Sequence, residues 1–183
     1  MTADKVILPQ SRFQFTIKRL CHQLIENYDD FNRSCLIGIQ DRGALLSDRL
    51  HRVLQNQMGV SLEYGKIDIS FYRDDYRRRD KPISPSANVM DFIIEDKKVI
   101  LVDDVLYTGR TIQAALMALQ QFGRPAEVEL LVLVDRRFNR HLPIEANYKG
   151  LTVDALDEAY VQVEWEHQNG VDQILLYSKK TEG

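Results

Sequence analysis

The fold is decided by the stretch Val99-Ile100-Leu101-Val102-Asp103-Asp104-Val105-Leu106-Tyr107-Thr108-Gly109-Arg110-Thr111, in which four apolar residues lead directly into two acids. A continuous apolar run without alternation is typical of a central parallel strand that is covered on both faces. Open α/β sheets bind their ligands at the carboxyl ends of such strands. We therefore expect the functional site at residues 103–111.

The turn after the acids has the composition of an anion-binding site. It combines successive backbone N–H groups, a glycine that can adopt positive φ and the hydroxyls of Thr108 and Thr111, and it leads into a helix. A phosphomonoester fits such a turn. Carboxylates beside it would repel the phosphate unless they bind sugar hydroxyls or a divalent cation, so the combination points to a phosphoribosyl group. The alternative is that Asp103 and Asp104 merely cap the following helix.

Bulk properties favour an ordinary globular protein with one domain over residues 1–183. The chain is 44% hydrophobic and 28% charged, and its formal net charge of -3 gives no global attraction for nucleic acid. The first five residues lack the pattern of a signal peptide and no apolar run reaches membrane-spanning length, so we expect a cytoplasmic protein. Cys21 and Cys35 are interpreted as small core residues.

Hydrophobic periodicity predicts an α/β fold with a central, mainly parallel sheet flanked by helices. Helices are expected after Ser11 as N-cap, from Gly43 and from Thr111 to Phe122; strands are expected at Cys35–Ile39, around 62–71, at 99–102 and at Val128–Val134. Residues 72–88 have few apolar residues and several charges, which indicates an exposed excursion from the sheet core. The alternation in residues 160–165 and the apolar run Ile174–Tyr177 predict a terminal β-hairpin.

The motif at 99–111, with Leu-Tyr inside its turn, resembles the phosphoribosyl pyrophosphate motif of the type I phosphoribosyltransferases. Together with segments 67–75, 123–125 and 131–136, it resembles the PyrR family over nearly the whole chain, from Val6 to Tyr177. The resemblance implies the type I fold and the reaction of uracil with phosphoribosyl pyrophosphate and Mg²⁺ to give UMP and pyrophosphate. Such enzymes form dimers and larger assemblies, and in many bacteria they also regulate pyrimidine genes by binding RNA.

The resemblance also implies roles for individual residues. Residues 72–90 would form a mobile lid loop and residues 135–150 a small hood segment over the substrate. Asp103 and Asp104 would hold the ribose hydroxyls, and Arg73 would act from the lid on the pyrophosphate. The loop Asp41, Arg42 and Gly43 would bind pyrophosphate, although relatives carry Lys or Arg and then Thr where this chain has Gln40 and Asp41. Mg²⁺ would be bound mainly through the substrate. The 5-phosphate would be bound by Val105, Leu106, Tyr107, Thr108, Gly109, Arg110 and Thr111, and the base by Asp135 and Arg136.

RNA binding is the second activity that the resemblance offers. Its candidate residues are Lys18, Arg19, His22 and Arg140, but Phe138, Asn139, Glu145 and Leu151 stand where relatives tend to be basic. An acid in a phosphate-contacting face weakens binding, so we rank regulation below catalysis.

Three alternatives to a uracil enzyme are weighed. One is a nucleotide-sensing RNA-binding regulator with little catalysis, and another is a phosphoribosyltransferase for a purine or orotate. A phosphoacceptor signalling domain is disfavoured because its acidic pair would follow the first strand. The four histidines, His22, His51, His141 and His167, show neither metal-ligand nor triad spacing.

Overall fold

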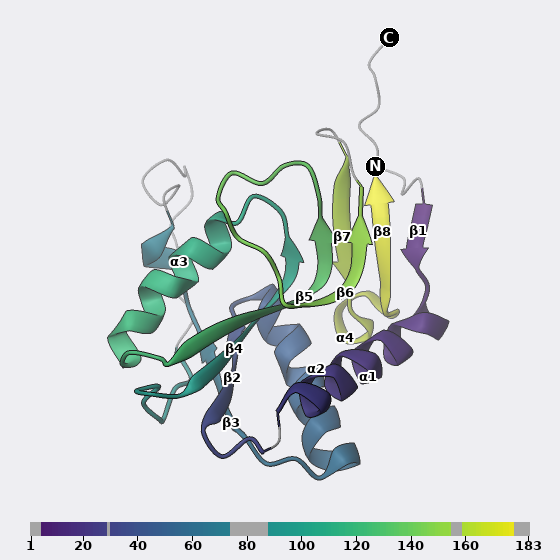
Figure 1. Ribbon diagram of the computed structural model, residues 1–183. Coiled ribbons are helices and arrows are strands. Elements are labelled where there is room, and N and C mark those ends of the chain that lie inside the picture. Colours follow the sequence, from purple (N-terminus) through teal and green to yellow (C-terminus); the bar gives the residue numbers. More distant parts are fainter. Residues whose placement is uncertain (1–4, 29, 74–87, 155–158, 178–183) are drawn as a thin grey trace.

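The computed structural model describes residues 5–28, 30–73, 88–154 and 159–177 of the chain. Its core is a parallel sheet with the strand order β3-β2-β4-β5-β6 (Figure 1). The five strands are β2 (Ser34–Ile39), β3 (Glu63–Ile67), β4 (Lys98–Leu106), β5 (Glu127–Arg136) and β6 (Tyr148–Val153). This confirms the predicted mainly parallel sheet.

Strand β4 lies at the centre of this sheet, as its apolar run predicts. Residues 99–102 are fully buried, and β4 pairs with β2 on one side and β5 on the other. The strand does not end before the acids, however. Because Val105 and Leu106 continue the apolar pattern, they remain in register with Val134 and Asp135 of β5. The two acids therefore lie inside the last part of a strand rather than after it.

Helices cover both faces of the sheet, which explains its apolar strands. Helices α1 (Gln10–Asn27) and α2 (Arg42–Met58) pack on one face, and α3 (Arg110–Leu119) followed by the 3-10 turn η3 (Gln120–Phe122) packs on the other (Figure 1). Helix α1 buries the predicted stripe, but it starts at Gln10 with Pro9 as N-cap, so Ser11 lies in its first turn. Cys21 and Cys35 are both fully buried, which confirms them as core residues.

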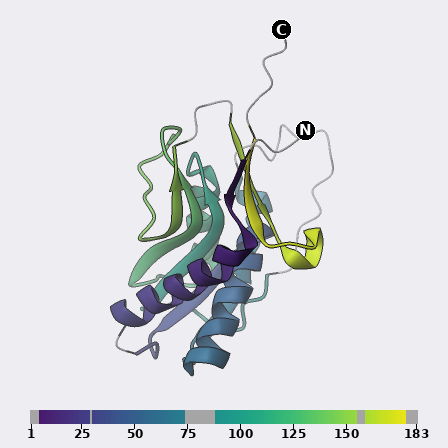
Figure 2. The same cartoon turned by 90° about the vertical axis from the view of Figure 1, so that its right-hand side faces the viewer.

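A second, smaller sheet stands beside the core. Strands β7 (Tyr160–Glu164) and β8 (Gln173–Tyr177) form the predicted antiparallel hairpin, connected through the short helix α4 (Glu166–Asn169). Strand β1 (Lys5–Leu8) pairs with β8 and completes the order β1-β8-β7, seen edge-on in Figure 2. No described helix is long and apolar enough to cross a membrane.

Two predicted segments have other bounds in the structure. Residues 148–150, placed in the hood segment, open β6 and belong to the core sheet, so only residues 137–147 connect β5 to β6. The predicted lid begins at the end of the 3-10 turn η1 (Ser70–Tyr72), and Val89 pairs with Lys66. Residues 74–87 of that prediction lie outside the described residues.

Candidate active site

A cavity of about 630 Å³ opens at the carboxyl end of β4. All seven residues that the resemblance assigns to the 5-phosphate line it, together with Arg73, Asp103 and Ile112. This is the place where open α/β sheets bind their ligands, outside the carboxyl ends of the strands. Arg73, which follows η1 in the connection between β3 and β4, also reaches the cavity.

The turn from Tyr107 to Thr111 is shaped by Gly109, whose φ of 89° lies in the left-handed region. That conformation is easy for glycine and unfavourable for residues with a Cβ. It allows α3 to begin at Arg110, and Gln113 donates its N–H to the Gly109 carbonyl at 3.0 Å. The N-terminus of an α-helix with its partial positive charge therefore faces this end of the cavity, together with the Thr108 and Thr111 hydroxyls.

Asp103 and Asp104 are each only 6% exposed, and their side chains have different surroundings. Successive side chains of a strand point to opposite faces. Asp103 lines the cavity, whereas Asp104 forms an ion pair with Arg42 of α2, with 2.7 Å between Oδ2 and Nε. Asp103 Oδ1 also accepts the Asp104 N–H at 2.9 Å. The pair is therefore not a simple helix cap.

Burial is the main cause that raises the pKa of Asp103 well above its ordinary value, and the charge of Asp104 adds to it. The hydrogen bond from the Asp104 N–H and the nearby charges of Arg73 and Arg42 act in the opposite direction. A buried carboxylate in this position is stabilised by any ligand that brings hydroxyl donors or a cation into the cavity. Asp103 is thus suited to sugar hydroxyls or to a metal-bound substrate.

The loop before α2 meets β4 very closely at Gly43. A Cβ at this position would lie 2.5 Å from the Val102 carbonyl oxygen and 2.9 Å from the Asp103 Cα, so only glycine fits without a shift. Arg42 beside it also donates Nη2–H to the Val163 carbonyl of β7 at 2.6 Å. Asp41 is exposed at the N-cap position of α2, after a cis peptide bond from Gln40. Arg42 and Gly43 therefore lie against the acids, and none of the three residues assigned to pyrophosphate lines the described cavity.

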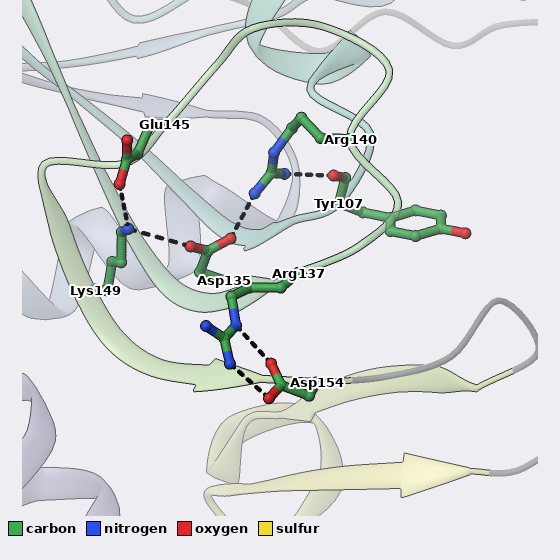
Figure 3. A network of polar contacts seen from close by, with 7 residues as sticks. All are labelled: Tyr107, Asp135, Arg137, Arg140, Glu145, Lys149 and Asp154. Atoms are coloured by element: carbon green, nitrogen blue, oxygen red, sulfur yellow. Dashed lines mark hydrogen bonds and ion pairs between the residues drawn. The ribbon is translucent and has the colours of Figure 1, made fainter.

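Asp135 and Arg136, which the resemblance assigns to the base, are the last two residues of strand β5 and lie next to Tyr107. Arg136 is 4% exposed, and its Cζ lies 4.0 Å from the centroid of the Tyr107 ring. Among the described residues, its Nε and Nη2 atoms have no hydrogen-bond partner. Asp135, also 4% exposed, pairs with Arg140 at 2.5 Å and with Lys149 at 3.3 Å, as Figure 3 shows. Neither residue lines the cavity, and Tyr107 lies at the boundary between the two.

The candidate RNA residues fall into two groups. Lys18, Arg19 and His22 are exposed on α1, and Arg19 also donates to the backbone carbonyls of Lys149 and Gly150. Arg140 is only 23% exposed in its side chain, and it binds Asp135 and the Tyr107 carbonyl instead. The sequence reasoning did not find the Arg42–Asp104 pair or the role of Lys149, because side-chain partners separated by tens of residues leave no local pattern.

Within the described part of the chain, no group of three or more His, Cys, Asp or Glu side chains is placed to hold a metal ion. Asp103 and Asp104 supply carboxylate oxygens, which Mg²⁺ prefers, but Mg²⁺ usually completes its coordination with water and substrate phosphates. The donor set fits a cation that arrives with a phosphorylated substrate.

Comparisons with known proteins agree with this geometry. Residues 5–168 match the phosphoribosyl transferase domain. The chain is 41% identical to "Bifunctional protein PyrR" of Haemophilus influenzae (strain PittEE) over 179 residues, covering 96% of this chain and 99% of that protein. It is 42% identical to the protein of the same name from Haemophilus ducreyi over 173 residues, covering 94% and 96%.

Among solved structures, a hypoxanthine phosphoribosyltransferase from Staphylococcus aureus superposes with a TM-score of 0.71 at 23% identity, covering 97% of this chain and 94% of that one. The hypoxanthine phosphoribosyltransferase of Trypanosoma cruzi gives 0.72 at 19% identity, covering 97% and 98%. At these identities, the structural likeness establishes the fold alone.

Proposed function

The chain belongs to the PyrR family of the type I phosphoribosyltransferases, and from that premise we propose that it makes UMP and pyrophosphate from uracil and phosphoribosyl pyrophosphate, as a salvage reaction. In this transfer, a bond forms between the uracil nitrogen and the anomeric carbon, and the bond from that carbon to the pyrophosphate oxygen breaks. The uracil nitrogen loses its proton. The transition state has a ribosyl-like positive charge, so neutralising the leaving pyrophosphate is the main electrostatic task.

One observation carries the proposal: a single cavity brings a helix N-terminus and a hydroxyl-rich turn together with the buried carboxylate of Asp103. The turn supplies donors for a 5-phosphate, and the carboxylate supplies acceptors for ribose hydroxyls. A ligand with a phosphate at one end and a diol at the other satisfies both. We assign the 5-phosphate to residues 105–111 and the ribose hydroxyls to Asp103 and Asp104.

Arg73 and Arg42 are assigned to the pyrophosphate. Arg73 lines the cavity, and its charge acts on Asp103. Arg42, the first residue of α2, forms an ion pair with Asp104 near the carboxyl end of β4. Mg²⁺ bound to the pyrophosphate oxygens would supply further charge neutralisation, with Asp103 and Asp104 as the nearby carboxylates.

The base is assigned to the corner at Asp135 and Arg136. Uracil carries both carbonyl and N–H groups, and a pocket that leaves either kind unpaired loses affinity. The buried Arg136 guanidinium has Nε–H and Nη2–H groups to offer a carbonyl-bearing edge, and Tyr107 beside it offers an aromatic face. A purine or orotate enzyme would share the donor site, so this corner decides the specificity.

The direct test is conversion of labelled uracil to UMP with phosphoribosyl pyrophosphate and Mg²⁺, with hypoxanthine, guanine and orotate offered separately under the same conditions. The proposal expects UMP as the product and turnover of the other bases at least about 100-fold slower, since unpaired polar groups discriminate strongly. IMP or orotidylate as the main product would instead identify hypoxanthine or orotate as the substrate base. No turnover with any base would contradict the enzyme assignment.

RNA binding is the second candidate function, because Lys18, Arg19 and His22 lie exposed on one helix and the relatives are named bifunctional. It is tested by titrating a pyrimidine-leader RNA at several salt concentrations, with Arg19→Ala and the exposed Arg124→Ala as matched variants. If α1 binds RNA, the logarithm of RNA affinity should depend less steeply on the logarithm of salt concentration in Arg19→Ala than in wild type, and Arg124→Ala should be unchanged. Equal salt dependence in both variants would show that α1 is not part of an RNA interface.

A further inference from the structure

The phosphate-binding turn is supported from behind by the segment that connects β5 to β6. Arg140 donates Nη1–H to the Tyr107 carbonyl, and His141 donates its N–H to the Thr108 carbonyl at 3.0 Å. Leu142 and Ile144 then pack against Gly109: a Cβ there would lie 3.5 Å from the Leu142 Cβ and 3.2 Å from the Ile144 Cδ1. Three consecutive residues of the turn therefore rest on residues 140–144.

The two carbonyl contacts determine where the N–H groups of the turn point. In a planar trans peptide, the C=O and the N–H of the next residue lie on opposite sides of the chain. Fixing the carbonyls of Tyr107 and Thr108 on segment 140–144 therefore directs the N–H groups of Thr108 and Gly109 away from that segment. Both residues line the cavity.

Arg140 is itself held by the core sheet. Its Nη2 binds Asp135 Oδ1 at 2.5 Å, and Asp135 is fixed at the last residues of β5 while also pairing with Lys149 of β6 (Figure 3). The Asp135 side chain is only 5% exposed and that of Arg140 only 23%, so water competes weakly for this contact. A planar guanidinium spans two acceptors in a fixed geometry, which a flexible side chain does not.

We propose that Arg140 is a positioning residue for the 5-phosphate site, which fixes the Tyr107 carbonyl so that the turn presents its N–H groups to the phosphate. The inference rests on the proposed function only in so far as the cavity binds a ribose phosphate, whatever the base. It differs from a contact with RNA, because the guanidinium is occupied by partners inside the protein.

The adjacent Arg137 provides a matched control. It pairs with Asp154 at 2.5 Å through both Nε and Nη2, and the two side chains are 54% and 52% exposed (Figure 3). Arg137→Met removes the same charge within three residues of Arg140 but removes no contact to the turn. A general electrostatic effect on the anionic substrate would therefore appear in both variants, and a positioning effect only in Arg140→Met.

The experiment measures the Kd of phosphoribosyl pyrophosphate with Mg²⁺, and of UMP, by calorimetric titration of wild type, Arg140→Met, Arg140→Gln and Arg137→Met. We expect the Kd to rise about tenfold or more in Arg140→Met, less in Arg140→Gln, which keeps one donor, and less than about twofold in Arg137→Met. The KM of uracil should change less than that of phosphoribosyl pyrophosphate. Arg140→Gln also guards against misfolding of the methionine variant.

Several results would overturn the inference. Equal Kd values in wild type and both Arg140 variants would show that the turn keeps its shape without Arg140, and an equal loss in Arg137→Met would assign the effect to net charge. If the wild-type protein binds neither phosphoribosyl pyrophosphate nor UMP, the cavity is not a ribose phosphate site and the inference fails. Because the titration needs no base, a wild type that binds donor but makes no UMP contradicts the proposed reaction and leaves the positioning result standing.

Discussion

Arg42 and Asp104 form an ion pair, with 2.7 Å between Nε and Oδ2, that joins the first turn of α2 to the carboxyl end of β4. The arginine side chain is half exposed, whereas that of Asp104 is 9% exposed. The same guanidinium binds the Val163 carbonyl of β7. One residue thus connects the acid pair, the proposed pyrophosphate loop and the small sheet.

Replacing Arg42 should reduce stability as well as transfer. Arg42→Met leaves the largely buried Asp104 carboxylate without this partner, and we expect the free energy of unfolding to fall by about 1–2 kcal/mol. Urea denaturation measures it. Lys98→Met is the control, because Lys98 and Glu127 are 3.4 Å apart and about half exposed, and such surface pairs contribute about 0–1 kcal/mol. Equal losses in the two variants would contradict a structural role for the Arg42–Asp104 pair.

Gly109→Ala should weaken binding of phosphoribosyl pyrophosphate about tenfold or more. The substitution forces a Cβ into the left-handed region at φ 89° and against Ile144, with a backbone cost of about 1–2 kcal/mol. Gly59→Ala is the matched control, because Gly59 has φ 67° at the C-cap of α2 and open space around it. Both variants should lose similar stability, and only Gly109→Ala should lose donor affinity. An unchanged Kd would show that the turn is not the phosphate site.

Asp103→Asn should gain stability relative to wild type as pH rises. The pKa of Asp103 is raised by burial and by Asp104, against the opposing charges of Arg73 and Arg42. The native state therefore keeps a proton that the unfolded chain loses near pH 4, and its stability falls with pH from there through the raised pKa. Asparagine does not titrate, so the free energy of unfolding of Asp103→Asn should increase relative to that of wild type as pH rises from about 4 through the raised pKa of Asp103.

Urea denaturation of both proteins in EDTA at pH 4, 6 and 8 measures this difference. Asp154→Asn should show no such trend between pH 4 and 8, because the hydrogen bond from Arg137 lowers the pKa of Asp154 and its effect on stability changes with pH only below about pH 4. A difference between Asp103→Asn and wild type that stays constant with pH would contradict the raised pKa.

Both cysteines should be inert in the folded protein. Burial raises the pKa of the Cys21 thiol and of the Cys35 thiol to about 12. At pH 8 only about one thiol in 10⁴ would then be ionised, and the thiolate is the reactive form. An aromatic disulfide reagent should label both thiols in urea and neither on the same timescale in buffer. Rapid labelling of the native protein would contradict the fully buried positions.

The parallel sheet, the cavity and its lining turn could be predicted because they depend on local patterns: an apolar run, adjacent acids and a Thr-Gly-Arg-Thr turn. Strand β1 could not, since four residues gain their strand conformation only by pairing with β8, about 170 residues later. The predicted hood includes the first three residues of β6, Tyr148-Lys149-Gly150, because its bounds rest only on its position between the core strands and the terminal hairpin. The contacts of Arg140 and Arg42 depend on three-dimensional neighbours, which charge and spacing do not reveal.

We propose above all that the carboxylates of Asp103 and Asp104 hold the ribose during phosphoribosyl transfer. The most direct test is the rate of UMP formation by wild type, Asp103→Asn, Asp104→Asn and the double variant, with the exposed Asp30→Asn at the amino end of β2 as control. We predict that each site variant lowers kcat/KM about tenfold or more and the double variant about 100-fold or more, since hydrogen bonds to charged groups are worth about 1.5–3 kcal/mol. Transfer at the wild-type rate in the double variant would contradict the claim.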